Sequence, residues 1–269
     1  MTLALVHLVW APLGQDPVRE FLRSYRQHPA GIEHDLVLVL NGAGTTPAVD
    51  LLPVELVDVE HRLIVLQRPV LDLDAYLETA ARLRHANVCF LNSYAVALAD
   101  GWLASLAAAL APPDVGLVGA SGSWESQAEW RRGALRHRPQ QLLRLARERR
   151  DFPRFPNPHI RTSSFALARD LLLGVGLERS VDKRTTYLHE SGRRSITRRV
   201  QAAGLQTLVA GRDGRAYDVE EWPESRTFRS GRQENLLVAD NQTRDYEHAS
   251  ARRRRRLARD SWGSRAVAG

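Results

Sequence analysis

Short apolar runs separated by helix-like segments recur through the first half of the chain. The apolar runs lie at 3–10, 35–40, 63–66, 87–91 and 115–119. Continuous runs of this length are typical of parallel strands that are covered on both faces. The helix-like segments between them lie at 16–28, 75–85 and 101–110. This alternation predicts an α/β fold with a doubly wound, mostly parallel sheet flanked by helices.

The second half of the chain has a less regular pattern. The expected elements are a basic helix, a proline-punctuated loop, two further helices and a sixth strand, at 130–150, 152–159, 165–173, 193–203 and 205–210. From Gly211 onward the chain is polar and typical of loops. We therefore predict an α/β domain over residues 1–210 and a loop-rich C-terminal extension over 211–269 with an arginine-rich tail.

Ligands of such sheets bind beyond the carboxyl ends of the strands, so the residues that follow each apolar run are candidates for a site. These residues lie at 11–12, 41–44, 69–74, 92–94 and 121–126. A later polar run, Asp240-Asn241-Gln242-Thr243, follows the apolar residues 236–238 and can fold back over such a site.

Composition narrows the class of protein. With 269 residues, 43% of them hydrophobic, the chain is long enough to bury a core. Cys89 is the single cysteine, so no internal disulfide can form. The N-terminus has neither the basic region nor the long apolar run of a secretion signal or membrane span. We expect a soluble protein of the cytoplasm.

The net charge is +7, and Lys183 is the only lysine, so the excess is arginine. A basic excess suits nucleic acid, an anionic membrane or a phosphate-bearing small molecule, and the arginine fork suits a diphosphate. A GC-rich genome explains the same excess. No helix-turn-helix, zinc or RNA-binding motif is present, so we expect no nucleic-acid partner. The run Arg252–Arg256 is either a solvated tail or helix, or a contact with the inner face of an anionic membrane.

Several segments occur in an order that resembles one enzyme family. The first three are a strand, a helix and a second strand at 5–10, 21–25 and 36–41. The stretch Asp72-Leu73-Asp74-Ala75-Tyr76 follows, and then the segment 90–103, which contains Asn92-Ser93-Tyr94 and Trp102-Leu103. The last are the strand 115–119 and His189-Glu190-Ser191-Gly192 before a helix. Over residues 3–210 this order resembles the family-two glycosyltransferases, which have a GT-A fold and belong to the nucleotide-diphospho-sugar transferase superfamily.

The resemblance implies a glycosyltransferase that moves a sugar from a nucleotide-sugar donor to a saccharide or glycoconjugate acceptor, with inversion, in bacterial polysaccharide biosynthesis. Such a reaction needs a carboxylate that takes the proton of the acceptor hydroxyl, and Glu190 is the candidate base. The alternative for Glu190 is a surface acid near a helix N-terminus, where the helix dipole favours it.

The resemblance also implies a donor site and an acceptor site. Candidate donor-binding residues are Pro12, Asn41, Asp74, Tyr76, Asn92, Ser93 and Tyr94. Candidates for the diphosphate or the acceptor are Trp124, Glu125, His159, Arg161 and Arg193. Some of them have a structural alternative: Asn41 as a turn residue, Asp74 as a helix cap, Trp124 as a core residue rather than a platform for a sugar, and each arginine as a solvated charge.

The segment Asn92-Ser93-Tyr94 departs from the family pattern. The family holds a divalent ion, Mn²⁺ or Mg²⁺, with an acidic Asp-x-Asp motif at this position, whereas amide and hydroxyl oxygens alone are weak ligands for a hard cation. We therefore name no metal ligand. Two interpretations stay open: a metal-independent enzyme, or a non-catalytic GT-A-like protein that binds a nucleotide or a sugar.

Overall fold

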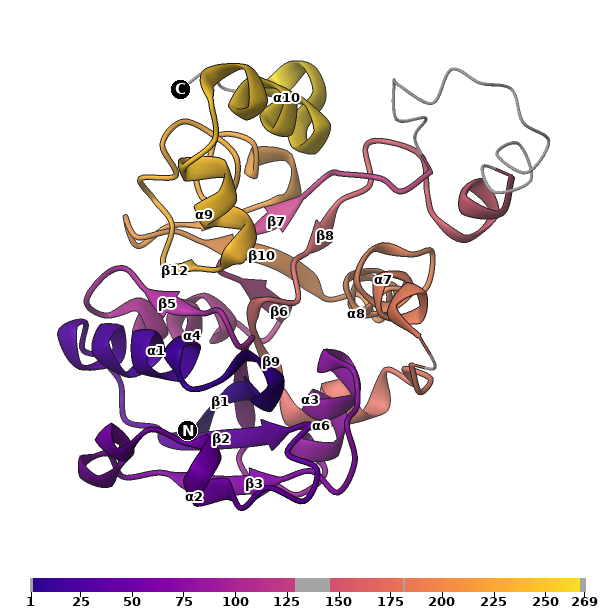
Figure 1. Cartoon of the computed structure of the whole chain (residues 1–269). Helices are drawn as coiled ribbons and strands as arrows, with labels where there is room; N and C mark the ends of the chain where they lie inside the picture. The colour runs from indigo at the N-terminus through magenta and orange to yellow at the C-terminus, as the bar shows by residue number, and fades with distance from the viewer. Residues whose placement is uncertain (1, 129–145, 181, 267–269) are drawn as a thin grey trace.

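The computed structural model describes residues 2–128, 146–180 and 182–266. In these residues, eight strands form one twisted sheet (Figure 1). Across the sheet they lie in the order β11 (Ala216–Tyr217), β10 (Gln206–Ala210), β6 (Val115–Gly119), β9 (Ser164–Ala168), β4 (Asn87–Leu91), β1 (Leu3–Trp10), β2 (Asp35–Asn41) and β3 (Arg62–Val65). The neighbours among β1, β2, β3 and β4 pair in parallel, as do β6 and β10. The predicted α/β class and mostly parallel sheet are confirmed.

Both faces of the sheet are covered, as the continuous apolar runs indicated. In β1, Leu3, Leu5 and Val9 belong to one core cluster, and the alternating residues Val6 and Leu8 belong to the other. Helices α1 (Asp16–Gln27) and α4 (Trp102–Leu110) pack on the first face. Helices α3 (Asp72–Ala80), α6 (Arg169–Gly174) and α8 (Ile196–Ala202) pack on the second.

Strand β9 corrects one prediction. We expected a helix at 165–173, but Ser164–Ala168 is a strand that pairs antiparallel with both β4 and β6, and helix α6 begins only at Arg169. Phe165 and Leu167 are completely buried between these neighbours. A short apolar run has no periodicity that distinguishes a buried strand from a buried helix, so the sequence pattern could not decide. The predicted helix at 193–203 likewise begins later, at Ile196.

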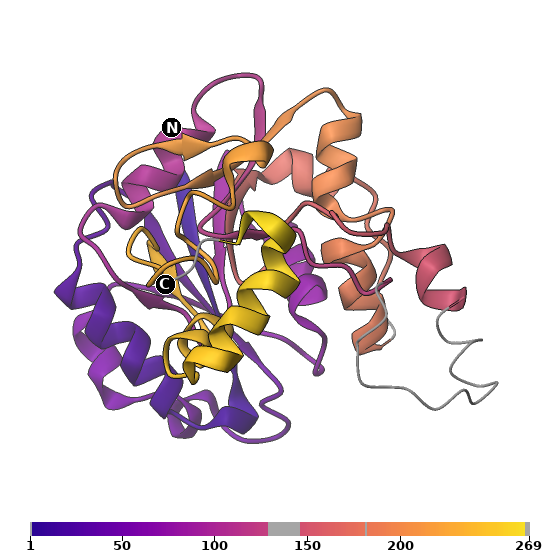
Figure 2. The ribbon, with the colours of Figure 1, turned by 90° about the horizontal axis from the view of Figure 1, so that it is seen from above.

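The C-terminal extension shares the core of the preceding domain. Strand β11 joins the main sheet, and β12 (Val238–Ala239) pairs with β5 (Val96–Ala97). Trp222 and Trp262 are buried in the core cluster on the second face. Helices α9 (Asn241–Glu247) and α10 (Ala251–Trp262) lie at the top of Figure 1, and Figure 2, seen from above, shows α10 crossing the middle of the molecule. The arginine run is thus part of a helix.

Shorter elements complete the chain. They are α2 (Ala48–Leu51), α7 (Lys183–Ser191), β7 (Gly122–Ser123), β8 (His159–Ile160) and the 3₁₀ helices η1 (Ala11–Leu13), η2 (Val54–Asp58), η3 (Val219–Glu221) and η4 (Gly263–Arg265). Of the basic helix predicted at 130–150, the part up to 145 lies outside the described residues, and 146–151 is helical. No helix in the described part of the chain combines the length and the apolar composition that crossing a bilayer requires.

Candidate functional site

A polar cavity of about 180 Å³ lies beside the β7–β8 ribbon. Its lining comes from four separate parts of the sequence: Ser123, Glu125 and Gln127; His159 and Arg161; Tyr187, Glu190 and Ser191; and Phe228, Arg229 and Gln242. Charged groups of both signs, amides, hydroxyls and one aromatic ring therefore face the same small volume. These groups can donate hydrogen bonds to the hydroxyls of a bound ligand and accept hydrogen bonds from them.

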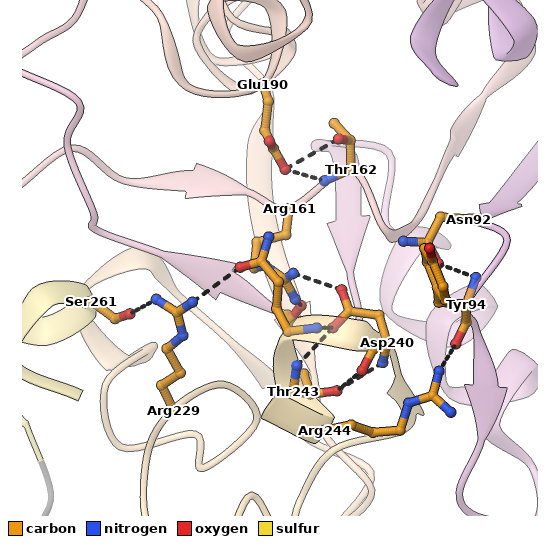
Figure 3. A network of polar contacts seen from close by, with 12 residues as sticks. Asn92, Tyr94, Arg161, Thr162, Glu190, Arg229, Asp240, Thr243, Arg244 and Ser261 are labelled. Carbon is orange, nitrogen blue, oxygen red and sulfur yellow. Dashed lines mark hydrogen bonds and ion pairs between the residues drawn. The ribbon is translucent and has the colours of Figure 1, made fainter. Parts of the chain in front are cut away.

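Glu190 lies in the last turn of α7, and its Oε1 accepts two hydrogen bonds from Thr162 (Figure 3). The backbone N–H donates at 2.9 Å and the hydroxyl at 3.1 Å. Among the described residues, none makes a hydrogen bond or an ion pair with its Oε2. The expected alternative, an acid favoured by a helix N-terminus, is wrong, because a carboxylate at the C-terminal end of a helix opposes the helix dipole. Thr162, rather than the helix, holds this carboxylate at the cavity.

A second carboxylate, Asp72 at the first position of α3, lies within electrostatic range of Glu190. Burial raises the pKa of Asp72, the Glu190 charge raises it further, and Lys183 opposes both effects. The sequence analysis selected the neighbouring Asp74 instead. The Asp74 carboxylate is buried and accepts the backbone N–H of Ser180, so it anchors a loop. The one feature of the sequence that could have predicted a position of Asp72 near the site is its place at the start of a helix that follows a strand.

His159 supplies a neutral imidazole to the cavity. Burial lowers its pKa below the usual value of 6.5, although the Glu190 charge raises it in part. The ring Nδ1 donates to the backbone carbonyl of Asn157 at 2.8 Å, so the proton of the neutral ring sits on Nδ1. The Nε2 atom of His159 is then an acceptor at neutral pH.

Arg161 and Asp240 form a buried ion pair of 2.6 Å at the cavity wall (Figure 3). Arg161 also donates to the hydroxyl of Ser121, and its guanidinium lies 4.1 Å from the centre of the Phe228 ring. Burial raises the pKa of Asp240, but Arg161 and the Thr243 backbone N–H lower it more, so Asp240 stays ionised. Gln242 of the polar run 240–243 also lines the cavity, so this run folds back beside it.

Arg229 extends this network from the C-terminal extension. Its guanidinium forms an ion pair with Glu125 at 3.1 Å and donates to the side chain of Gln242. It stacks on Phe228 with 4.7 Å between the guanidinium carbon and the ring centre. Burial is the main cause that lowers the pKa of Arg229, while Glu125 supports its charge. Sequence reasoning missed Phe228 and Arg229, because they lie in a segment without periodic structure.

The segment Asn92-Ser93-Tyr94 follows β4, as predicted, but three of its oxygens already accept hydrogen bonds within the protein. The Asn92 side-chain oxygen accepts the Tyr94 backbone N–H, and the Ser93 hydroxyl accepts the Trp10 backbone N–H. The Tyr94 carbonyl accepts a hydrogen bond from Arg244 of α9 (Figure 3). In the part of the chain that the structure describes, no three His, Cys, Asp or Glu side chains gather in a group able to hold a metal ion. The residues at this position therefore do not fit a divalent cation.

The other predicted donor residues differ in their availability to a ligand. Pro12 is exposed in η1, directly after β1. The Asn41 amide is buried and pairs with both backbone groups of Val70. The Tyr76 ring is completely buried against Phe90, in the core. Packing therefore keeps the side chains of Asn41 and Tyr76 from a ligand, and they do not enter the proposed site.

Two predicted residues of the diphosphate or acceptor site lie outside the cavity lining. Trp124 is partly buried and packs edge-on against Trp262, with 5.8 Å between the ring centres, which favours the core-packing alternative. Arg193 is exposed and donates to the backbone carbonyls of Arg149 and Arg150. Glu125, His159, Arg161 and Glu190, in contrast, line one cavity.

The sequence matches no protein-family model and no curated protein. Among solved structures it is similar to a mannosyltransferase from Pyrobaculum calidifontis in complex with GDP-Man and Mn²⁺, with 15% identity, a TM-score of 0.47, and coverage of 83% of this chain and 59% of that one. It is also similar to glucosyl-3-phosphoglycerate synthase from Mycobacterium tuberculosis, with 16% identity, a TM-score of 0.37, and coverage of 63% and 56%. It is similar as well to TarS of S. aureus, with 12% identity, a TM-score of 0.38, and coverage of 64% of this chain and 48% of that one. This chain thus spans about half of the length of each, and the ligands named are theirs.

Proposed function

We propose that this protein is a glycosyltransferase that moves a sugar from a nucleotide-sugar donor to a hydroxyl of a saccharide or glycoconjugate acceptor, in bacterial polysaccharide assembly. The observation that carries the proposal is Glu190: a carboxylate held against the helix dipole by Thr162, with a second oxygen that no described residue engages, at the wall of a polar cavity. The order of sequence segments that resembles family-two glycosyltransferases supports the same function.

The proposed reaction forms one bond and breaks another. The acceptor oxygen bonds to the anomeric carbon as the bond between that carbon and the donor diphosphate breaks. Glu190 Oε2 takes the hydroxyl proton, and Thr162 fixes the orientation of the carboxylate through Oε1. The departing diphosphate carries the electron pair of the broken bond and needs positive charge nearby.

In this proposal the guanidinium of Arg161 supplies the positive charge and the N–H donors for the diphosphate, although Asp240 offsets part of that charge. Arg161 lines the cavity, and its ion pair with Asp240 fixes its orientation. The residues at 92–94 do not fit a divalent ion, so we assign no step to a metal. The donor nucleotide lies at the carboxyl edge of β1 and β4, beside Pro12 and Asn92.

The remaining cavity residues fit an acceptor sugar. Amide groups come from Gln127 and Gln242, a carboxylate from Glu125 and a hydroxyl from Ser123. Phe228 supplies an apolar ring. Sugar hydroxyls pair with such polar groups, while the C–H face of a sugar packs on an aromatic ring. The acceptor hydroxyl would then face Glu190.

Glu190→Gln tests this function. Glutamine keeps the shape and can still accept from Thr162, but it cannot take a proton, so turnover should fall by about a hundredfold or more while donor affinity barely changes. The matched control is Glu247→Gln, an exposed acid at the C-terminal end of α9, which should leave both quantities unchanged. The measurement is the transfer rate and donor affinity on folded variants. Near-native turnover in Glu190→Gln would remove it from the mechanism.

A second candidate function is a non-catalytic domain that binds a nucleotide or a sugar. The observation that favours it is the segment 92–94, where the side-chain oxygens of Asn92 and Ser93 accept backbone N–H groups and the Tyr94 carbonyl accepts from Arg244. A thermal-shift panel of nucleotide-sugars shows which donor the protein binds, because specific binding raises the unfolding temperature in either case, and an assay of turnover with that donor then separates the two functions. Binding by the parent protein without turnover, across a broad acceptor panel, would favour the non-catalytic function.

A further inference from the structure

Four arginines surround an open cavity of about 330 Å³ at the start of α8. Arg193, Arg194, Arg198 and Arg199, which we call the arginine cluster, line it together with Ala202. None of the four forms an ion pair with a carboxylate of the described residues. Many exposed arginines elsewhere in the chain do have acidic partners, for example Arg226 with Glu234 and Arg265 with Glu224. The arginine cluster is therefore a local excess of positive charge.

Neutral oxygens hold three of the four arginines in place. Arg193 donates to backbone carbonyls of the preceding helical segment, and Arg199 donates to the carbonyls of Arg194 and Val175 at 2.8 and 2.6 Å. Arg198 donates to the side-chain oxygen of Asn157 at 3.2 Å. Carbonyl and amide oxygens fix the guanidinium groups without cancelling their charge. Each guanidinium has five N–H donors, so several stay available for a ligand.

Arg198 shows that the cluster lacks a counter-charge. Its Nε–H is buried and has no partner among the described residues. Burial lowers the pKa of Arg198, and the neighbouring charge of Arg193 lowers it further. A buried donor without an acceptor and like charges without an anion are both unfavourable. An anion between the guanidinium groups would relieve both, and phosphate oxygens match the arginine fork in geometry.

The arginine cluster is connected to the cavity that holds Glu190. Asn157, which accepts from Arg198, also donates to the backbone carbonyl of Ser191 at 2.7 Å, and Ser191 lines that cavity. Helix α8 packs beside β6, β8 and β10, whereas the proposed donor edge lies at β1 and β4. The cluster is thus on the acceptor side of Glu190.

We infer that the arginine cluster binds a phosphate or diphosphate group carried by the acceptor. That the ligand is an acceptor rests on the proposed function. The anion site itself does not depend on transfer activity. The phosphate belongs either to a water-soluble acceptor or to the headgroup of a lipid. The two sources share the chemistry that the cluster recognises, and the experiment separates them.

The test measures binding of inorganic pyrophosphate to the full chain by calorimetry. The variant Arg194→Gln/Arg198→Gln should weaken binding by about tenfold or more, because it removes two charged forks. The matched control, Arg252→Gln/Arg256→Gln, removes the same charge from exposed positions of α10 and should bind as the parent does. If the double variant does not fold, Arg194→Gln alone serves, because its exposed side chain makes no hydrogen bond or ion pair that the described residues show.

A second arm uses phosphatidylcholine vesicles with and without phosphatidylglycerol. If the protein sediments with the anionic vesicles and this requires Arg194 and Arg198, the ligand is a lipid headgroup. If the protein binds pyrophosphate but does not sediment with the vesicles, the ligand is a soluble phosphate. Equal pyrophosphate affinity in the parent, the cluster variant and the control would overturn the inference, as would tighter cluster-dependent binding of an oligonucleotide. Because no arm requires turnover, failure here is distinct from failure of Glu190→Gln to lower the transfer rate.

Discussion

His7 lies in the middle of β1, completely buried, with its ring stacked on Phe21 at 4.0 Å between ring centres. Neither ring nitrogen has a hydrogen-bond partner among the described residues. Burial without compensation lowers the pKa of His7 from 6.5 to about 3. The folded protein therefore keeps this ring neutral at pH values where the unfolded chain protonates it.

This difference makes the free energy of unfolding depend on pH in a known direction. Above pH 6.5 both states carry a neutral ring, so His7 adds no pH dependence. Between pH 6.5 and about 3 the unfolded state binds one more proton, so stability is lost as the pH falls. Each pH unit in this window costs about 1.4 kcal/mol, which gives about 2 kcal/mol between pH 7.5 and pH 5.

His7→Phe removes the titrating group and keeps an aromatic ring against Phe21. Urea unfolding of both proteins at pH 7.5 and pH 5 should show that the parent loses about 2 kcal/mol more than the variant, since the other groups with shifted pKa values are common to both. If phenylalanine is too large for the core, His7→Leu gives the same comparison.

The control is His248→Gln, which replaces an exposed ring directly after the end of α9 and should lose as much stability as the parent does. Parallel losses in the parent and in His7→Phe would refute the reasoning. They would mean that His7 gains solvent or a partner when it is protonated, at no cost to the fold.

Two further predictions concern the cavity wall and the metal. Asp240→Asn should lower the free energy of unfolding by about 3–5 kcal/mol, because Arg161 is left buried without its counter-charge; urea unfolding measures it, and a loss below about 1 kcal/mol would show that water reaches Arg161. Chelation with EDTA should leave the transfer rate nearly unchanged, since the residues at 92–94 offer no carboxylate; loss of transfer that Mn²⁺ restores would point to Asp72 and other carboxylates as ligands.

The sequence predicted those parts of the fold in which periodicity carries the information. The parallel strands were visible as continuous apolar runs, because helices cover both faces of the sheet. Strand β9 was not, because a run of four buried residues between two neighbouring strands cannot be told by its composition from a buried helix turn. The position of a strand between β4 and β6 is decided by long-range pairing, which local pattern does not contain.

The candidate site was predictable only where chemistry and chain order coincide. Glu125, His159, Arg161 and Glu190 are polar residues in or beside loops, and they line one cavity. Tyr76 was selected from its place in a motif, but its side chain faces the core. Burial of a single side chain depends on which way its helix is rotated, and sequence order does not fix that rotation.

The ion pair between Arg161 and Asp240 also sets an order of events during synthesis of the chain. A ribosome releases the strands of the sheet, Glu190 and Arg161 well before it makes residues 226–243. Until then the cavity lacks the wall that Phe228, Arg229 and Gln242 form, and Arg161 has no anion to pair with. A nascent or truncated chain that ends near residue 210 would therefore carry the candidate base without an enclosed site. The proposed transfer activity would therefore require the C-terminal extension to be made and docked.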